Sequence, residues 1–235
     1  MLDFIRIACA VPAVRVGDTA KNAEDICAYI EKADGERADI VLFPELALTG
    51  YTCQDLFFQD TLWTGVQQGI RKIADCTKDH PGVTAAVGLP VRTGMRLYNC
   101  AAVISRGKIH ALVPKTYIPN YNEFYEKRWF SSGAEVTEDM AELLGEPVPI
   151  LPRAVFRVGG TLLGVEICED MWTPLPPSTF LALNGAEVIL NLSASNETIG
   201  KRAYRRGLVQ HQSAALNCVY AYCSAGSTES TQDLI

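Results

Sequence analysis

The feature that most constrains the fold is the alternation of short apolar runs with amphipathic stretches along the chain. Apolar runs closed by Pro or Gly are typical of buried strands, and apolar residues three or four positions apart are typical of helices. The expected strands span residues 4–10, 39–43, 83–88, 97–104, 108–113, 154–158, 161–167, 188–192 and 219–223. The expected helices span residues 19–33, 62–73, 179–184 and 201–217. This order, with hairpin turns at 106–107 and 159–160, predicts an α/β fold with a mixed sheet and helices outside.

The composition is that of a globular domain and excludes several classes of protein. Hydrophobic residues make up 48% and charged residues 20% of the 235 residues, and the formal net charge is −6. A chain of this length buries a core without disulfide or metal staples. The acidic balance argues against a nucleic-acid or anionic-membrane binder, and no apolar run is long enough to span a bilayer. We therefore expect neither nucleic acid nor membrane among its partners.

The cysteines and histidines do not form a metal-binding pattern. Eight cysteines are scattered through mostly apolar segments without a Cys-x-x-Cys pair, and the three histidines lie far apart. This spacing predicts no zinc site, so we expect no metal. The first residues do not read as a signal peptide, and free thiols then indicate a reducing, cytoplasmic location. The stretch 130–152 has several acidic residues and no basic one, which predicts a solvated excursion on the surface.

Three polar residues follow directly on expected strands, where α/β folds place their sites. They are Glu45, Lys115 and Cys168. Each alone also fits an ordinary role as a cap, a solvated cation or a packed thiol. Together they supply a nucleophile, a base for its proton and a positive charge for an oxyanion. No histidine stands at a strand end, so a carboxylate is the expected base.

A carboxylate is a weak base for a thiol, whose pKa is about 8.5 in water. The combination therefore requires a desolvated pocket that raises the pKa of Glu45. It also requires a Lys115 charge that favours the Cys168 thiolate. A water-excluding site at buried strand ends meets that requirement.

The segments around these residues resemble the nitrilase (carbon–nitrogen hydrolase) superfamily. They read FPELALTGY at 43–51, PKTYIPNYNEFYEKR at 114–128 and GVEICEDMW at 164–172. More narrowly, they resemble the amino-terminal glutaminase domains of glutamine-dependent NAD synthetases. The segments 97–99, 191–196, 200–202 and 229–234 also match that narrower family in order. The resemblance covers nearly the whole chain.

The resemblance implies a four-layer α-β-β-α sandwich with mixed sheets and a glutamine amidohydrolase activity. Residues 1–235 would form one carbon–nitrogen hydrolase (glutaminase) domain, truncated before its last strands. Ammonia released from L-glutamine through a cysteine thioester would feed the amidation of deamido-NAD to NAD. That step, which uses ATP and Mg, belongs to a C-terminal synthetase domain absent from this chain. The glutaminase domain itself needs no cofactor, and the family implies a homo-oligomer.

The resemblance also assigns residues to roles. Glu45 would be the base, Lys115 the oxyanion-stabilising cation and Cys168 the nucleophile. Glu123, eight residues after the lysine, would be a positioning group near the base. A carboxylate suits the ammonium of a free amino acid, and a basic side chain suits its carboxylate. The implied substrate-binding residues are Tyr51, Tyr121, Glu169, Ser195, Lys201 and Arg202.

Two alternatives stay open at the level of sequence. The chain is equally compatible with a stand-alone amidase or nitrilase that acts on another small amide, because pocket shape sets the substrate. It is also compatible with an inactive truncated fragment that serves as an interaction module. Substrate preference separates the first alternative from a glutaminase, and thiol reactivity at Cys168 tests the second.

Overall fold

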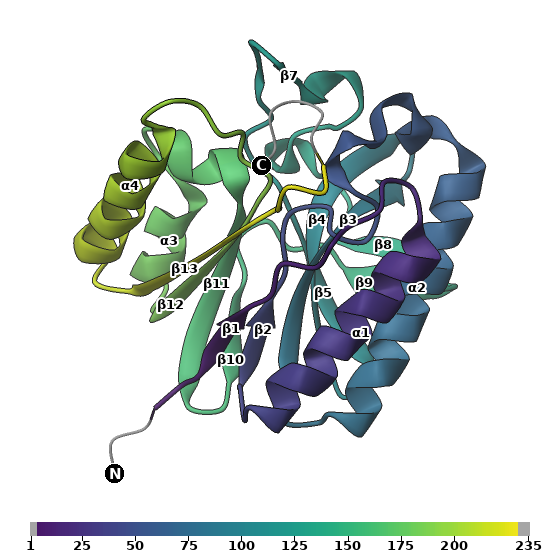
Figure 1. Ribbon diagram of the computed structural model, residues 1–235, viewed down its shortest axis with the longest axis horizontal. Helices are drawn as coiled ribbons and strands as arrows, with labels where there is room; N and C mark the ends of the chain where they lie inside the picture. Colours follow the sequence, from purple (N-terminus) through teal and green to yellow (C-terminus); the bar gives the residue numbers. More distant parts are fainter. Residues whose placement is uncertain (1–3, 230–235) are drawn as a thin grey trace.

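The computed structural model describes residues 4–229, and the sequence match at 230–234 lies outside the described residues. Two sheets form the centre of the molecule (Figure 1). The first has the order β1-β2-β3-β4-β5, with bounds Ile7–Cys9, Ile40–Leu42, Thr84–Thr93, Arg96–Ser105 and Lys108–Pro114. The second has the order β10-β11-β12-β13, with bounds Val155–Val158, Thr161–Ile167, Val188–Ser193 and Val219–Ser224.

Both sheets are mixed, as expected. In the first sheet β1, β2 and β3 run parallel, and β4 and β5 add antiparallel hairpins. In the second sheet β11, β12 and β13 run parallel, and β10 pairs antiparallel with β11. The parallel strands are buried because helices cover the outer face of each sheet.

Four helices form the outer layers, two on each sheet (Figure 1). The first sheet is covered by α1 (Thr19–Gly35) and α2 (Asp60–Asp79), and the second by α3 (Pro177–Leu183) and α4 (Lys201–Leu216). Close packing of α1 on α2 requires glycine, because a Cβ at Gly65 would lie 2.4 Å from the Thr19 hydroxyl oxygen. The four-layer α-β-β-α sandwich is thus confirmed. No helix within residues 4–229 is both long and apolar enough to cross a membrane.

The two sheets pack on each other through an inter-sheet core of aliphatic side chains and two cysteines. Its residues are Ile40, Leu42, Ala86, Ala101, Val103, Val113, Leu163, Val165, Ile167, Cys168, Val188, Leu190, Leu192 and Cys223. A separate, larger cluster fills the space between the first sheet and its helices. A third lies between the second sheet and its helices.

The acidic stretch 130–152 differs from its prediction as a solvated excursion. It contains the short helix η3 (Gly133–Glu135) and a hairpin of β8 (Met140–Leu143) and β9 (Glu146–Pro149). Burial alternates along β8, so its acidic side chain faces out while Ala141 and Leu143 are buried in the core. Alternation of period two, rather than charge, decides the structure here.

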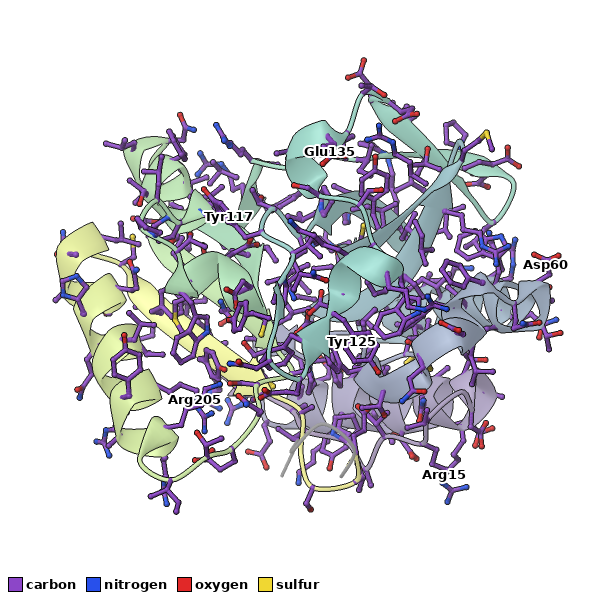
Figure 2. The ribbon with its side chains drawn as sticks, turned by 90° about the horizontal axis from the view of Figure 1, so that it is seen from above. Arg15, Asp60, Tyr117, Tyr125, Glu135 and Arg205 are labelled. Carbon is purple, nitrogen blue, oxygen red and sulfur yellow. The ribbon has the colours of Figure 1, made fainter. Side chains whose placement is uncertain are left out.

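Short elements gather at the carboxyl ends of the central strands. They are the short helices η1 (Tyr51–Phe58), η2 (Glu126–Arg128) and η4 (Cys168–Trp172), and a hairpin of β6 (Asn120–Tyr121) and β7 (Phe124–Tyr125). Seen from above, Tyr117, Tyr125 and Arg205 border this end, whereas Asp60 lies at the outer end of α2 (Figure 2). This end of the sandwich holds the predicted site residues.

Candidate active site

The three side chains at the strand ends are all buried. Glu45 follows β2, Lys115 follows β5 and Cys168 follows β11, and their exposed fractions are 1%, 0% and 7%. The Glu45 loop packs directly on β3, because a Cβ at Gly88 would lie only 2.3 Å from the backbone nitrogen of Leu46. Glycine at this position therefore allows the base to approach the sheet.

Lys115 lies between two carboxylates. Its Nζ is 2.6 Å from Glu45 Oε1, and 2.7 and 2.9 Å from the two oxygens of Glu126. Tyr51 donates its hydroxyl to Glu126 Oε1 at 2.7 Å. A buried cation of this kind is tolerated only when charged partners replace its lost hydration.

The electrostatics follow from burial and pairing. Burial by itself lowers the pKa of Lys115, but the carboxylates of Glu126 and Glu45 raise it well above its usual value. Burial raises the pKa of Glu126 to about 7, against the opposing effect of Lys115. The two carboxylates therefore favour the charged form of Lys115, whereas burial favours the neutral form of Glu126.

The backbone of Cys168 is unusual. Its φ of +45° lies in the left-handed region, which a non-glycine residue adopts only when the surrounding structure enforces it. The backbone N–H of Ala194 donates to Glu45 Oε2 at 2.9 Å. The same N–H group lowers the pKa of the Cys168 thiol, and the Glu45 carboxylate raises it, so both groups lie close to the sulfur.

Burial raises the pKa of the Cys168 thiol above its usual value, and Glu45 raises it further. Lys115 and the Ala194 N–H lower it, but less. The lysine charge acts in the expected direction, toward the thiolate, but burial and the Glu45 carboxylate outweigh it and raise the pKa of the thiol. The thiol therefore requires a base to remove its proton.

Asn99 is a site residue that sequence reasoning did not select. It lies in β4, is 1% exposed and donates Nδ2–H to Glu45 Oε1 at 2.7 Å. The side-chain oxygen of Asn99, Oδ1, is buried without a hydrogen-bond partner among the described residues. The sequence feature that could have identified Asn99 is a polar amide inside an otherwise apolar stretch of the strand.

Glu123 does not hold the positioning place near the base, and Glu126 does. Glu123 lies at the tip of the β6–β7 hairpin, where its carboxylate accepts from the side chain of Asn196. Tyr51, expected among the substrate-binding residues, is 4% exposed and donates its hydroxyl to Glu126.

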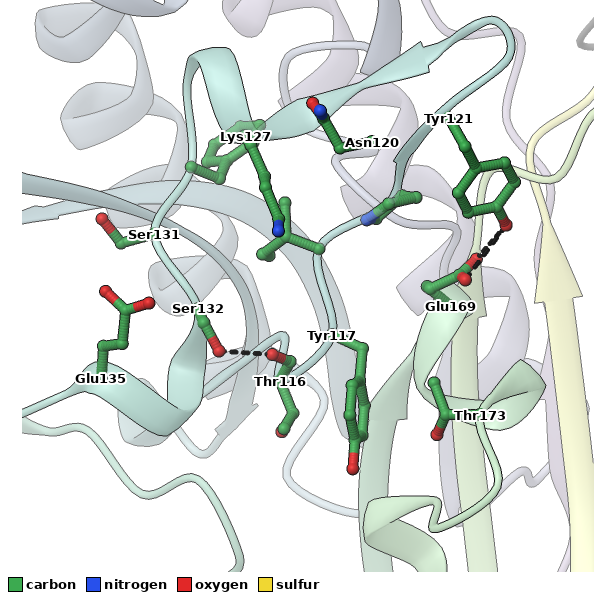
Figure 3. A pocket seen from close by; sticks show the side chains of 13 residues that line it. Thr116, Tyr117, Asn120, Tyr121, Lys127, Ser131, Ser132, Glu135, Glu169 and Thr173 are labelled. Carbon is green, nitrogen blue, oxygen red and sulfur yellow. Dashed lines mark hydrogen bonds between the residues drawn. The ribbon is translucent and has the colours of Figure 1, made fainter.

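Tyr121 and Glu169 face each other at the edge of a pocket, as Figure 3 shows, and Glu169 directly follows Cys168 in the chain. The Tyr121 hydroxyl donates to Glu169 at 2.9 and 3.0 Å. Both side chains line a cavity of about 660 Å³, together with Tyr117, Lys127 and other polar residues of the 116–135 segment. Burial raises the pKa of Glu169, and its neighbour along the chain is Cys168.

The 195–205 segment contributes further polar side chains near the nucleophile, since Lys201 and Cys168 interact electrostatically. The Lys201 ammonium lies 5.1 Å from the ring centre of Trp172 and donates to the side chain of Asn196. Ser195 is buried, and Arg205 Nη1 lies 3.4 Å from its hydroxyl. Arg202 is exposed on α4, so the structure does not bring it into the group.

No set of three or more His, Cys, Asp or Glu side chains within residues 4–229 is arranged to hold a metal ion. The polar centre is organised by charge pairing and backbone N–H groups instead.

Comparison with known proteins places this geometry in context. The family model described as carbon–nitrogen hydrolase matches residues 6–232. The chain is 38% identical over 234 residues to the glutamine-dependent NAD(+) synthetase of Mycobacterium tuberculosis (strain ATCC 25618 / H37Rv). It is 37% identical over 223 residues to that of Xylella fastidiosa (strain 9a5c). These alignments cover 98% and 94% of this chain but only 34% and 37% of the relatives, so the chain spans about a third of their length.

Solved structures show the same fold. A glutamine-dependent NAD(+) synthetase from Cytophaga hutchinsonii superposes with a TM-score of 0.82 at 29% identity, covering 95% of this chain and 36% of that one. An amidase of the nitrilase superfamily from Nesterenkonia superposes with a TM-score of 0.76 at 18% identity, covering 94% and 76%. The second likeness concerns the fold alone.

Proposed function

Because this chain belongs to the carbon–nitrogen hydrolase family, we propose that it hydrolyses the side-chain amide of L-glutamine through a Cys168 thioester. One observation carries the proposal: the buried ion pair of Glu45 and Lys115 lies close enough to the Cys168 thiol for both charges to act on its pKa. The choice of glutamine follows the relatives, which are named glutamine-dependent NAD(+) synthetases.

The reaction proceeds in two halves. Glu45 takes the thiol proton as the Cys168 sulfur attacks the amide carbon, and Lys115 stabilises the developing oxyanion together with the backbone N–H of Glu169. Glu45 then gives the proton to the leaving nitrogen, which departs as ammonia and leaves a thioester. In the second half Glu45 takes a proton from water, the hydroxide attacks the thioester, and glutamate leaves as the thiol is restored.

The surrounding charges suit the two ends of a free amino acid. Glu169, held by Tyr121, would accept the substrate ammonium, and Lys201 would pair with its carboxylate. Ser195 lies beside α4, where Arg205 Nη1 is 3.4 Å from its hydroxyl. Since Lys201 keeps few competing carboxylate partners, its ammonium is available to an anion.

The test compares glutamate release from L-glutamine by the wild type, Cys168→Ala and Cys218→Ala. The two cysteines are matched, since each is 7% exposed, but Cys218 packs between the second sheet and its helices. We expect release to vanish in Cys168→Ala and to persist in Cys218→Ala. Wild-type turnover by Cys168→Ala would refute the assignment. Preference for another small amide in a substrate panel would identify a stand-alone amidase instead.

The wider roles are also proposals. In a longer protein the ammonia would serve the ATP- and Mg-dependent amidation of deamido-NAD on a synthetase domain. The sequence has neither a Ser-Gly-Gly-x-Asp nor a G-x-x-x-x-G-K phosphate loop, so residues 1–235 supply only the glutaminase half of that reaction. We further propose a cytoplasmic homo-oligomer, which light scattering after size-exclusion chromatography and cell fractionation would test.

A further inference from the structure

We propose that Asp170 is a positioning residue that holds Cys168 and Lys115 in register for catalysis. The inference rests on the proposed function, because this register matters only where both side chains act on one substrate. Asp170 lies in η4 and is only 1% exposed. Within the described residues its carboxylate is held by backbone N–H groups rather than by a basic side chain.

The carboxylate joins two distant segments of the chain. Asp170 Oδ1 accepts from the backbone nitrogens of Tyr117 at 2.8 Å and Thr116 at 3.1 Å. Its Oδ2 accepts from the backbone nitrogen of Ile167 at 3.0 Å. Three backbone donors therefore converge on one buried acid, and two of them come from the loop after β5.

The positions of these donors connect them to the chemistry. Thr116 directly follows Lys115, and Ile167 directly precedes Cys168. The lysine belongs to the first sheet and the cysteine to the end of the second, and apolar packing between sheets is not directional. Hydrogen bonds are directional, so the Asp170 link supplies the lateral register that the inter-sheet core does not.

The link also supports the backbone of the nucleophile. The left-handed φ of Cys168 is unfavourable for a residue with a side chain, and such a conformation persists only where neighbouring contacts fix it. Asp170 fixes Ile167, the residue just before Cys168, by accepting from its backbone nitrogen. Loss of the carboxylate would leave buried N–H groups without an acceptor, and the two loops would relax to find new partners.

The experiment uses Asp170→Ala, Asp170→Asn and a control at Thr77. The amide in Asp170→Asn keeps one carbonyl acceptor and nearly the same shape. Thr77 is also fully buried and accepts from the Gly107 backbone nitrogen at 2.8 Å, at the opposite end of β5. Thr77→Val removes this cross-link without touching the site, so it reports what a purely structural loss does.

Two readouts separate positioning from stability. The first is kcat and KM for glutamine hydrolysis, and the second is the pH profile of Cys168 alkylation by iodoacetamide, located by peptide mass spectrometry. We expect Asp170→Ala to lower kcat about 100-fold with a small change in KM, as for an ångström-scale misplacement. Asp170→Asn should lose less and so rescue part of the rate. Both Asp170 variants should shift the pH dependence of the rate of Cys168 alkylation. Thr77→Val should change neither the kinetic constants nor this pH dependence.

An unchanged kcat in both Asp170 variants would overturn the proposal, and so would a rate loss with an unshifted alkylation profile. Failure of both variants to fold would also overturn it, since Asp170 would then be a requirement of the fold. If the wild type does not hydrolyse glutamine, the proposed function fails. The alkylation profiles need no substrate, and they then decide the role of Asp170 separately.

Discussion

Replacing Lys115 with methionine isolates the electrostatic cost of the buried site. Methionine keeps most of the apolar stem and removes the ammonium. The carboxylates of Glu45 and Glu126 then stay in place with side chains that are 0% and 2% exposed. No other cation lies within ion-pair distance of them in residues 4–229. The variant therefore leaves two buried carboxyl groups without a counter-ion.

The distances set the magnitude. At 2.6 Å to Glu45 and 2.7 Å to Glu126, each pair attracts with about 6 kcal/mol at an effective dielectric constant of about 20. Most of this attraction offsets the cost of removing the three ions from water. Breaking a buried pair from one side costs about 3–5 kcal/mol, and we expect that loss in the free energy of unfolding at pH 8.

The loss should depend on pH with a definite sign. Burial already raises the pKa of Glu126 to about 7 with the lysine present, and removing the lysine raises it further. An acid whose pKa is raised in the folded state keeps its full stability below the unfolded value of about 4.3. That stability is lost as pH rises through the folded pKa. The deficit of Lys115→Met should therefore shrink markedly at pH 5.5.

Urea unfolding followed by circular dichroism at pH 8 and pH 5.5 measures both effects. The control is Lys72→Met, which breaks a solvent-exposed pair with Glu24 at 3.1 Å and should change the free energy of unfolding very little. Equal losses in the two variants at pH 8 would refute the reasoning. So would a Lys115→Met deficit that stays the same at pH 5.5.

Three further predictions concern the same end of the sandwich. Iodoacetamide should alkylate Cys168 in the free protein ever faster from pH 7 to well above 9, because burial raises its pKa; a plateau below pH 7 would contradict this. Asn99→Leu should lower kcat about 10-fold through loss of the bond to Glu45, visible in steady-state kinetics, whereas unchanged rates would exclude that contribution. Gly88→Ala should displace the Glu45 loop and lower both activity and melting temperature. Gly207→Ala, in open space on α4, should raise the melting temperature slightly, and equal effects of the two changes would contradict the packing argument.

The central strands and the positions of the three site residues could be predicted from sequence. Apolar runs closed by Pro44 or Pro114 mark strands that are buried on both faces, and this signal is local. A polar residue just after such a run lies at a strand end, and strands of one direction bring their ends together. The positions of Glu45 and Lys115 could be predicted from the sequence for that reason.

Which glutamate lies beside Lys115 and Glu45 could not be predicted from the sequence in this way. Glu123 and Glu126 are three residues apart, and which one turns inward depends on the tight β6–β7 turn. Asn122 adopts a φ of +50° there, so Glu123 lies at the tip and Glu126 begins η2 beneath it. Asn99 was missed for a different reason, since only the meeting of β4 with the Glu45 loop gives it a partner.

The inter-sheet core has a consequence for how the sequence can vary. Glu45 and Lys115 are carried by one sheet and Cys168 by the other, so the thickness of the layer between them sets the gap between base and nucleophile. A methyl group added at Ala101 or removed at Val165 changes that thickness, because packed interiors transmit volume changes. Substitutions of equal size under α1 and α2 leave the gap alone. Equally buried substitutions should therefore lower enzyme turnover more in the inter-sheet core than under α1 and α2.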